Sequence, residues 1–126
     1  ETYQLSLFFF LLIHKETEQP IGECGFHTWN KKHKRAELFY NIIDESHKQN
    51  GYMTEALKAV LDFGYTKLSL HRIEALVANS NIPSVKLLLR NNFTKEGIMR
   101  EDYNIKGKNE DSVCYSLLKW EWESKI

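Results

Sequence analysis

The sequence has little cysteine, little proline and no excess of charge of either sign. Its 126 residues include two cysteines and two prolines, and 17 lysines and arginines balance 17 aspartates and glutamates. Two distant cysteines are too few for a disulfide framework, which favours a reducing compartment such as the cytoplasm. Because the charges balance, no overall field favours nucleic acid, an anionic membrane or a polyanionic substrate as a partner.

Long hydrophobic runs are also missing. The most apolar stretch, residues 5–13, is about half of the ~20 residues that a membrane-spanning helix requires. No basic segment precedes it and no small-residue cleavage site follows it, so it does not have the pattern of a signal peptide. We therefore interpret it as a buried strand. The chain length predicts a single domain over residues 1–126, because it fits one hydrophobic core.

The pattern of apolar residues predicts an α/β fold with two main helices. From Met53 onward, apolar residues recur at helical spacing and form one stripe. Asn81 and Pro83 are typical of the start of a second helix, which we expect to end near residue 90. Asn91 and Asn92 favour that end, because asparagine tolerates the left-handed conformation. Strands are predicted at residues 5–13, 21–29, 36–43, 72–78, 93–99 and 112–118.

The order of these elements predicts the arrangement of the sheet. Residues 5–43 would form an antiparallel meander. The helix that separates residues 36–43 from 72–78 implies a right-handed parallel crossover between those strands. We therefore expect a mixed central sheet of about six strands. The last two strands would be joined by a long polar connection that contains Gly107.

A turn between a strand and a helix carries the most distinctive chemistry. The segment His47-Lys48-Gln49-Asn50-Gly51-Tyr52-Met53 follows the third predicted strand and opens the first predicted helix. Free backbone N–H groups at such a turn, together with the helix dipole, favour an anion such as a pyrophosphate. Gly51 permits close approach of the ligand, and Lys48 supplies a positive charge. An ordinary strand-to-helix turn has the same short pattern, so the turn alone does not identify a ligand.

The wider pattern resembles the GNAT superfamily of N-acetyltransferases. Within it, the chain looks like the RimJ/RimL-type branch, which contains the ribosomal-protein N-terminal acetyltransferases and their relatives. The resemblance spans essentially the whole chain in order and spacing. The segments that carry it are Ala36–Tyr40, Lys48–Leu57, His71–Ala75, Asn81 with Ser84, and Tyr115–Leu118.

Some positions depart from the family pattern. Lys48 stands where glutamine or arginine is usual, Met53 replaces a second small residue, and residues 91–93 replace Leu-Gly-Phe. The first two changes leave backbone donation to a phosphate intact. The family also opens with a strand and a pair of helices before Leu5, and we expect these elements to be lacking here. They normally wall the site of the acceptor amine.

The resemblance implies a GNAT fold in which two central parallel strands splay apart and acetyl-CoA, as co-substrate, lies between them. It implies acetyl transfer to a primary amine, and the branch points to a protein N-terminal amine. Alternatives are a small-molecule acetyltransferase acting on a polyamine, amino acid or aminoglycoside, and a non-catalytic acyl-CoA-binding module. The residues expected at acetyl-CoA are Phe39, Tyr40, Asn41, Ile42, Lys48, Gln49, Asn50, Gly51, Tyr52, Met53, Asn81 and Ser84.

Direct transfer to an amine needs a base for the ammonium and an acid for the departing thiolate. Glu37 falls at the position of the catalytic glutamate in the histone-acetylating branch, although a solvated or paired strand glutamate is the alternative. Glu101 and Asp102 are rival bases. Leu88 occupies the position where many relatives carry a tyrosine acid. Ser84 is therefore the candidate acid by resemblance, with a plain helix-terminus residue as the alternative.

Two further features bear on partners. The five histidines are scattered without the spacing of a zinc site, so no metal is expected. Trp120 and Trp122 follow the last predicted strand and, with Tyr115, could form a homodimer contact or cover the edge of the core. The sequence leaves both open.

Overall fold

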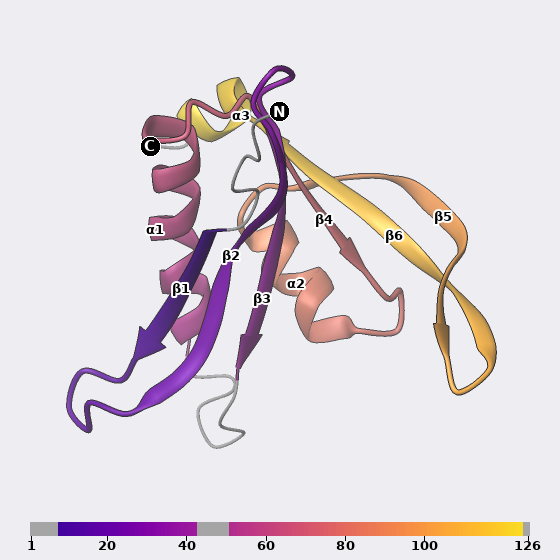
Figure 1. Ribbon diagram of the computed structural model, residues 1–126, viewed down its shortest axis with the longest axis horizontal. Coiled ribbons are helices and arrows are strands. Elements are labelled where there is room, and N and C mark those ends of the chain that lie inside the picture. Colours follow the sequence, from indigo (N-terminus) through magenta and orange to yellow (C-terminus); the bar gives the residue numbers. More distant parts are fainter. Residues whose placement is uncertain (1–7, 43–50, 125–126) are drawn as a thin grey trace, which may run out of the picture.

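The structure is a computed structural model that describes residues 8–42 and 51–124 (Figure 1). Its order of strands and helices confirms the predicted mixed α/β fold with two main helices. The elements are β1 (Phe8–Ile13), β2 (Pro20–Asn30), β3 (Arg35–Ile42), α1 (Tyr52–Thr66), β4 (Arg72–Val77), α2 (Ile82–Arg90), β5 (Thr94–Ile105), β6 (Lys108–Leu118) and α3 (Lys119–Glu123).

The six strands form one sheet in the order β1-β2-β3-β4-β6-β5. The expected buried strand is instead an edge strand, and Phe9, Leu11 and Ile13 of β1 are each about half exposed because no element of the described residues covers that face. All neighbours pair antiparallel except β3 and β4, which are parallel, as the crossover predicts. Their pairing covers only residues 35–37 opposite residues 72–74, although β3 continues to Ile42 and β4 to Val77. Beyond Glu37 and Glu74 the two strands separate, and Figure 1 shows them diverging. The expected splay of the central strands is therefore present.

The hydrophobic core lies between α1, α2 and one face of the sheet. The buried stripe of α1 includes Leu57 and Tyr65, and α2 contributes Leu87 and Leu88. Alternate strand residues face opposite sides of a sheet. The strand residues that join this core are Cys24, Phe26, Ala36, Leu38, Ile73, Ala75, Val113, Tyr115 and Leu117.

The other face of the sheet carries the residues between these core positions. Among them are His27, Glu37 and Glu74, which lie opposite one another across β2, β3 and β4. One face is thus packed by helices, and the second carries the charged residues next to the splay. No helix in the described part of the chain is long and apolar enough to span a membrane.

The β5–β6 hairpin differs from the prediction. Instead of a long polar connection between residues 99 and 112, both strands continue and are joined by Lys106 and Gly107. Both turn residues have positive φ, 51° and 83°, as in the two-residue turns whose twist matches a hairpin. Asn104 Oδ1 also accepts a hydrogen bond from the Gly107 N–H at 3.1 Å. The prediction was wrong because the extension is mostly exposed and polar, so it lacks the regular apolar alternation that marks a strand.

The C-terminal tryptophans lie in α3, which the sequence did not predict because five residues are too few to show helical periodicity. The Trp122 ring stacks on Tyr65, with centroids 5.0 Å apart. Trp122 therefore covers the edge of the core, one of the two alternatives left open. Trp120 is 61% exposed.

Candidate active site

The splay between β3 and β4 holds a cavity of about 470 Å³. It brings together several residues that the sequence singled out: Glu37, Phe39, Tyr40, Asn81, Ser84 and Asp102. Across this gap, β3 and β4 have no ladder pairing beyond Glu37 and Glu74 in the described residues. Unpaired strand edges leave backbone N–H and C=O groups able to bond an extended ligand.

The cavity reaches both faces of the sheet because neighbouring β3 residues point to opposite sides. Glu37 lies on the charged face, opposite His27 and Glu74. Tyr40 lies opposite Cys24 of the core and so belongs to the helix-covered face, where α2 carries Ser84. A ligand in the gap would therefore have a carboxylate on one side and two hydroxyls on the other.

Glu37 has surroundings that make its carboxyl a stronger base. Its side chain is 22% exposed, and its Oε2 lies 3.4 Å from His27 Nε2. Burial is the largest effect and raises the pKa of Glu37. His27 opposes this shift, and the carboxylates of Glu74 and Asp102 add to it. The net result is a raised pKa, which is common at functional sites and matches a carboxyl more closely to proton transfer near neutral pH.

Ser84 is held in the first turn of α2 by the predicted cap. The Ser84 backbone N–H donates to Asn81 Oδ1 at 3.2 Å, which leaves the hydroxyl of Ser84 outside the capping interaction. At the other end of α2, Asn92 has a φ of 67°. The capping asparagine and the left-handed asparagine are both confirmed.

Tyr40 places a second hydroxyl beside Ser84. Burial raises the pKa of Tyr40, and the neighbouring Ser84 hydroxyl has a smaller opposing effect. The Tyr40 Oη atom is nevertheless buried without a hydrogen bond of normal geometry among the described residues. The contact between the Tyr40 and Ser84 hydroxyls therefore does not count as a hydrogen bond, because hydrogen bonds weaken steeply when their distance or angle departs from the normal range. A buried, unsatisfied hydroxyl costs stability and therefore suggests a ligand that would complete it.

The predicted pyrophosphate turn is described only in part. His47, Lys48, Gln49 and Asn50 lie outside the described residues. Gly51 caps α1 with a φ of 77°, and a side chain at this position would meet no atom within 4 Å.

The residues next to Gly51 are also placed. The Tyr52 hydroxyl lies 3.2 Å from His14 Nε2, and the Met53 side chain packs in the core. Both side chains are therefore directed elsewhere, and Tyr52 and Met53 would contact a phosphate through the backbone N–H groups of the first helical turn. Asn41 is exposed near the end of β3, and Ile42 is its last residue.

The structure distinguishes between the two rival bases, Glu101 and Asp102. Asp102 lines the cavity, whereas Glu101 does not. The Glu101 backbone N–H donates to Asp111 Oδ1 at 2.7 Å. The β5–β6 pairing is irregular between Met99 and Tyr103. Such bulges redirect side chains, and this one occurs where Asp102 and Tyr103 reach the cavity.

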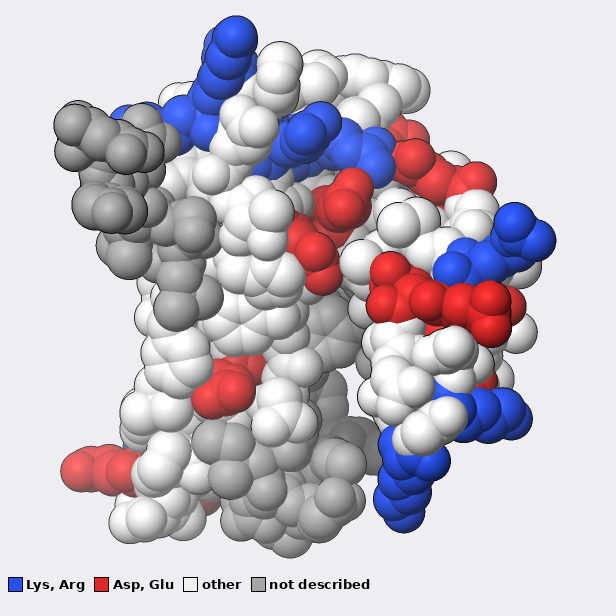
Figure 2. All heavy atoms as spheres, turned by 45° about the vertical axis from the view of Figure 1, so that its right-hand side comes forward, with Lys and Arg blue, Asp and Glu red and all other residues white. Residues whose placement is uncertain are grey.

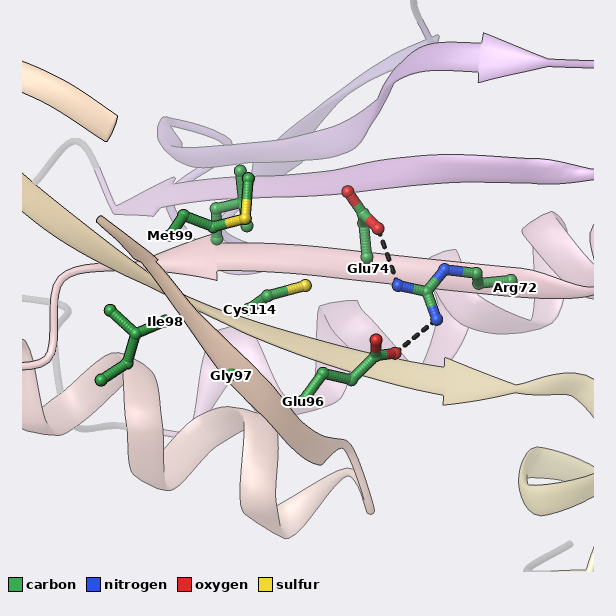
Figure 3. Close-up of a pocket in the computed structure, with 8 residues that line it drawn as sticks. Arg72, Glu74, Glu96, Gly97, Ile98, Met99 and Cys114 are labelled. Carbon is green, nitrogen blue, oxygen red and sulfur yellow. Dashed lines mark hydrogen bonds and ion pairs between the residues drawn. The ribbon is translucent and has the colours of Figure 1, made fainter. Parts of the chain in front are cut away.

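A second cavity of about 350 Å³ adjoins the first, and Leu76 lines both. The Arg72 guanidinium lies here between two carboxylates (Figure 3). Its Nη2 donates to Glu74 Oε2 at 2.8 Å, and its Nη1 donates to Glu96. This hydrogen bond lowers the pKa of Glu96. The network fixes Glu74 beside Glu37, and no short sequence motif marks it.

One further residue, His27, was missed as a functional candidate. The hairpin between β2 and β3 was predicted, but the register shift between His27 and Asn30 means that counting outward from its turn would not have paired His27 with Glu37. The structure holds no group of three or more histidine, cysteine, aspartate or glutamate side chains suited to a metal ion within residues 8–42 and 51–124.

Comparison with known proteins gives consistent matches. The family described as the acetyltransferase (GNAT) domain matches residues 1–94. The chain is 42% identical over 113 residues to a Bacillus licheniformis protein named as an uncharacterized N-acetyltransferase, covering 90% of this chain and 63% of that protein. The chain spans less than two thirds of the length of that protein, p20, and of two Bacillus subtilis relatives, YoaA and YjcK.

Two solved structures share the fold over most of this chain. Mutant forms of the spermidine/spermine N-acetyltransferase of Vibrio cholerae align with a TM-score of 0.88 and 25% identity, over 95% of this chain and 71% of that one. Ribosomal-protein-S5-alanine acetyltransferase of Vibrio fischeri aligns with a TM-score of 0.86 and 26% identity, over 92% and 63%.

Proposed function

Because this chain belongs to the GNAT acetyltransferase family, we propose that it transfers an acetyl group from acetyl-CoA to a primary amine. The observation that carries this proposal is the gap between β3 and β4. Around one cavity, it places a carboxylate on one face of the sheet and two hydroxyls on the other. An amine and a thioester that meet there would have a base on one side and an acid on the other.

The residues present fit acetyl-CoA. The unpaired edges of β3 and β4 suit an extended arm that bonds backbone groups, and Gly51 leaves open space at the N-terminus of α1. We propose that residues 39–42 meet the arm. The turn at residues 48–53 would hold the phosphates, and Asn81 and Ser84 would border the reacting end. Bound acetyl-CoA supplies the activated acyl thioester.

We assign the two proton transfers to residues on opposite faces of the sheet. Glu37 would take a proton from the acceptor ammonium, which its raised pKa supports. Ser84 would donate a proton to the departing thiolate. A backbone N–H on the unpaired edge of β3 would donate to the developing oxyanion. Asp102 is the alternative base, because it lines the same cavity.

For the acceptor we propose a protein N-terminal amine, as in the RimJ/RimL-type branch. The fold shared with the alanine acetyltransferase of Vibrio fischeri supports this acceptor. A polyamine is the second candidate, and a specific observation favours it. Glu37, Glu74, Glu96 and Asp102 line the two adjoining cavities, and Figure 2 shows acidic side chains on both sides of the hollow there. Carboxylates of this kind attract polycations.

Two measurements test the proposed reaction. Acetyl-CoA should raise the melting temperature, because a ligand that binds only the folded state stabilises it. Mixing the protein, acetyl-CoA and an amine panel should release free thiol in excess of that from acetyl-CoA alone. A raised melting temperature without thiol release would instead identify a non-catalytic acyl-CoA-binding module.

A competition between acceptors tests the amine. Peptides beginning with alanine or serine and spermidine are offered together, and the products are identified by mass spectrometry. Acetylated peptide amine as the main product supports the N-terminal acceptor. Acetylspermidine as the main product identifies a polyamine as the acceptor. The ratio of acetylspermidine to acetylated peptide should then fall at high salt, because salt screens the attraction between the carboxylates and the polyamine.

A further inference from the structure

We infer that His27 is a positioning residue that passes the proton collected by Glu37 to solvent; this inference rests on the proposed acetyl transfer. His27 lies directly opposite Glu37 in the β2–β3 ladder, on the face away from the helices. Its Nε2 is 3.4 Å from Glu37 Oε2, and its side chain is 38% exposed. Glu37 lines the cavity, and His27 is the more exposed of the two side chains.

The orientation of the His27 ring is fixed on two sides. Its Nδ1 lies 2.8 Å from Thr28 Oγ1. The ring also stacks on Phe39 with centroids 5.7 Å apart and planes 27° apart. When Nδ1–H donates to the Thr28 hydroxyl, Nε2 is left as the acceptor that faces Glu37.

The backbone after His27 supports a special role for this contact. Thr28 has a φ of 54°, which is a genuine outlier for a β-branched residue. The β2–β3 register also shifts between His27 and Asn30. Bulges and strained residues of this kind occur where a side chain must be held in a set direction. Here the bulge holds the Thr28 hydroxyl against the imidazole.

The proton steps balance. A nitrogen–proton bond of the acceptor ammonium breaks as a Glu37 O–H bond forms. That O–H bond then breaks as a proton bonds to His27 Nε2, which gives an imidazolium beside a carboxylate. The imidazolium releases the Nε2 proton to water and returns to its starting tautomer. Histidine suits this step because it gains and loses a proton near neutral pH.

The charged groups around Glu37 define the expected pH effect. Burial has the largest effect and raises the pKa of Glu37, His27 on β2 lowers it, and Glu74 on β4 and Asp102 on β5 raise it further. In a His27→Gln variant only the raising effects remain. The acid limb of the kcat/KM profile should therefore move to higher pH. The matched control is His33→Gln, in the exposed turn between β2 and β3, which should keep the wild-type profile.

Chemical rescue separates proton passage from a merely structural contact. We expect His27→Ala to lower kcat on the order of tenfold, less than the 10²–10⁴ of a direct acid–base catalyst. Added imidazole should restore this loss in weak buffer and leave the wild-type rate unchanged. Lack of rescue, or a pH profile of His27→Gln that superimposes on that of the wild type, would overturn the inference.

A titration without turnover keeps the inference distinct from the proposed function. The ¹³C signal of the Glu37 carboxyl is followed by NMR against pH in the full chain and in His27→Gln. The pKa of Glu37 should be higher in the variant, and an equal pKa would overturn the coupling. If no amine is acetylated, the proposed function fails, while this titration still decides whether His27 and Glu37 act as a pair.

Discussion

Glu37 and Glu74 lie opposite each other at the last paired position of β3 and β4. Burial is the main cause of the raised pKa of Glu37, and Glu74 adds to it because like charges on neighbouring strands repel. Arg72 donates to Glu74 at 2.8 Å and offsets part of that charge. The strands thus separate at a point where one carboxyl is tied to an arginine and the other is a strengthened base next to the cavity.

Replacement of the proposed base should change both the rate and its pH dependence. Glu37 must be deprotonated to accept a proton, so wild-type kcat/KM should rise with pH through the pKa of Glu37. Because that pKa is raised, the rise should lie above the ordinary value of about 4.3. Glu37→Gln should lower kcat/KM by about 10²–10⁴-fold and remove this rise. Unchanged kinetics, as expected for the exposed control Glu123→Gln, would contradict the assignment and favour Asp102.

Arg72 should act on the same pH profile through Glu74. Arg72→Gln removes the guanidinium between Glu74 and Glu96 (Figure 3) and leaves the Glu74 charge uncompensated beside Glu37. The pKa of Glu37 should rise further, and the acid limb of kcat/KM should move to higher pH. Arg100→Gln, at an exposed position of β5, is the control. An acid limb that stays in place would show that the network does not reach Glu37.

The local patterns in the sequence were sufficient for most of the fold. The apolar stripe of α1, the Asn81 cap and the left-handed Asn92 depend on residues a few positions apart, and all three are present. The parallel crossover followed from the order of strand, helix and strand. Glu37 and Ser84 were singled out by resemblance, and the structure places both at one cavity. Their roles stay predictions.

The features that the sequence did not reveal depend on register and long-range contacts. His27 meets Glu37 only because a bulge at Thr28 sets the β2–β3 register. Arg72 meets Glu96, 24 residues further on, through the pairing of β4 with β6 and of β6 with β5. Neither contact leaves a short motif. Cross-strand pairs of this kind require the register of every strand between them.

Substitution of Gly51 tests the phosphate-binding turn. Gly51 has a φ of 77° and caps α1, so Gly51→Val strains the turn and crowds the approach of a ligand to the backbone. The dissociation constant of CoA, measured by calorimetry, should rise by about tenfold or more, which is about 1.4 kcal/mol. Gly107→Val is a matched control, because Gly107 also has a positive φ and open space around it. Equal affinities of the two variants for CoA would rule out this turn as the phosphate site.

Ser84 should affect the chemical step without loss of the helix cap. The cap uses the Ser84 backbone N–H, so Ser84→Ala should leave stability within about 0.5 kcal/mol. If the hydroxyl protonates the thiolate, kcat should fall on the order of 10²-fold at unchanged KM for acetyl-CoA. Ser80→Ala, in the exposed turn before α2, should retain wild-type kcat. A wild-type kcat in Ser84→Ala would contradict the role of Ser84 as the acid and show that it is only a helix-terminus residue.

The buried hydroxyl of Tyr40 should cost stability in the ligand-free protein and contribute when acetyl-CoA binds. Its Oη is buried without a hydrogen bond of normal geometry among the described residues, and an unsatisfied hydroxyl costs about 1–3 kcal/mol. Tyr40→Phe keeps the ring and removes this cost, so urea unfolding should show an increase of about 1 kcal/mol in the free energy of unfolding. The same variant should bind acetyl-CoA more weakly, because the ligand would lose the hydroxyl that it completes. Reduced stability of Tyr40→Phe without ligand would show that the hydroxyl already has a partner in the folded chain.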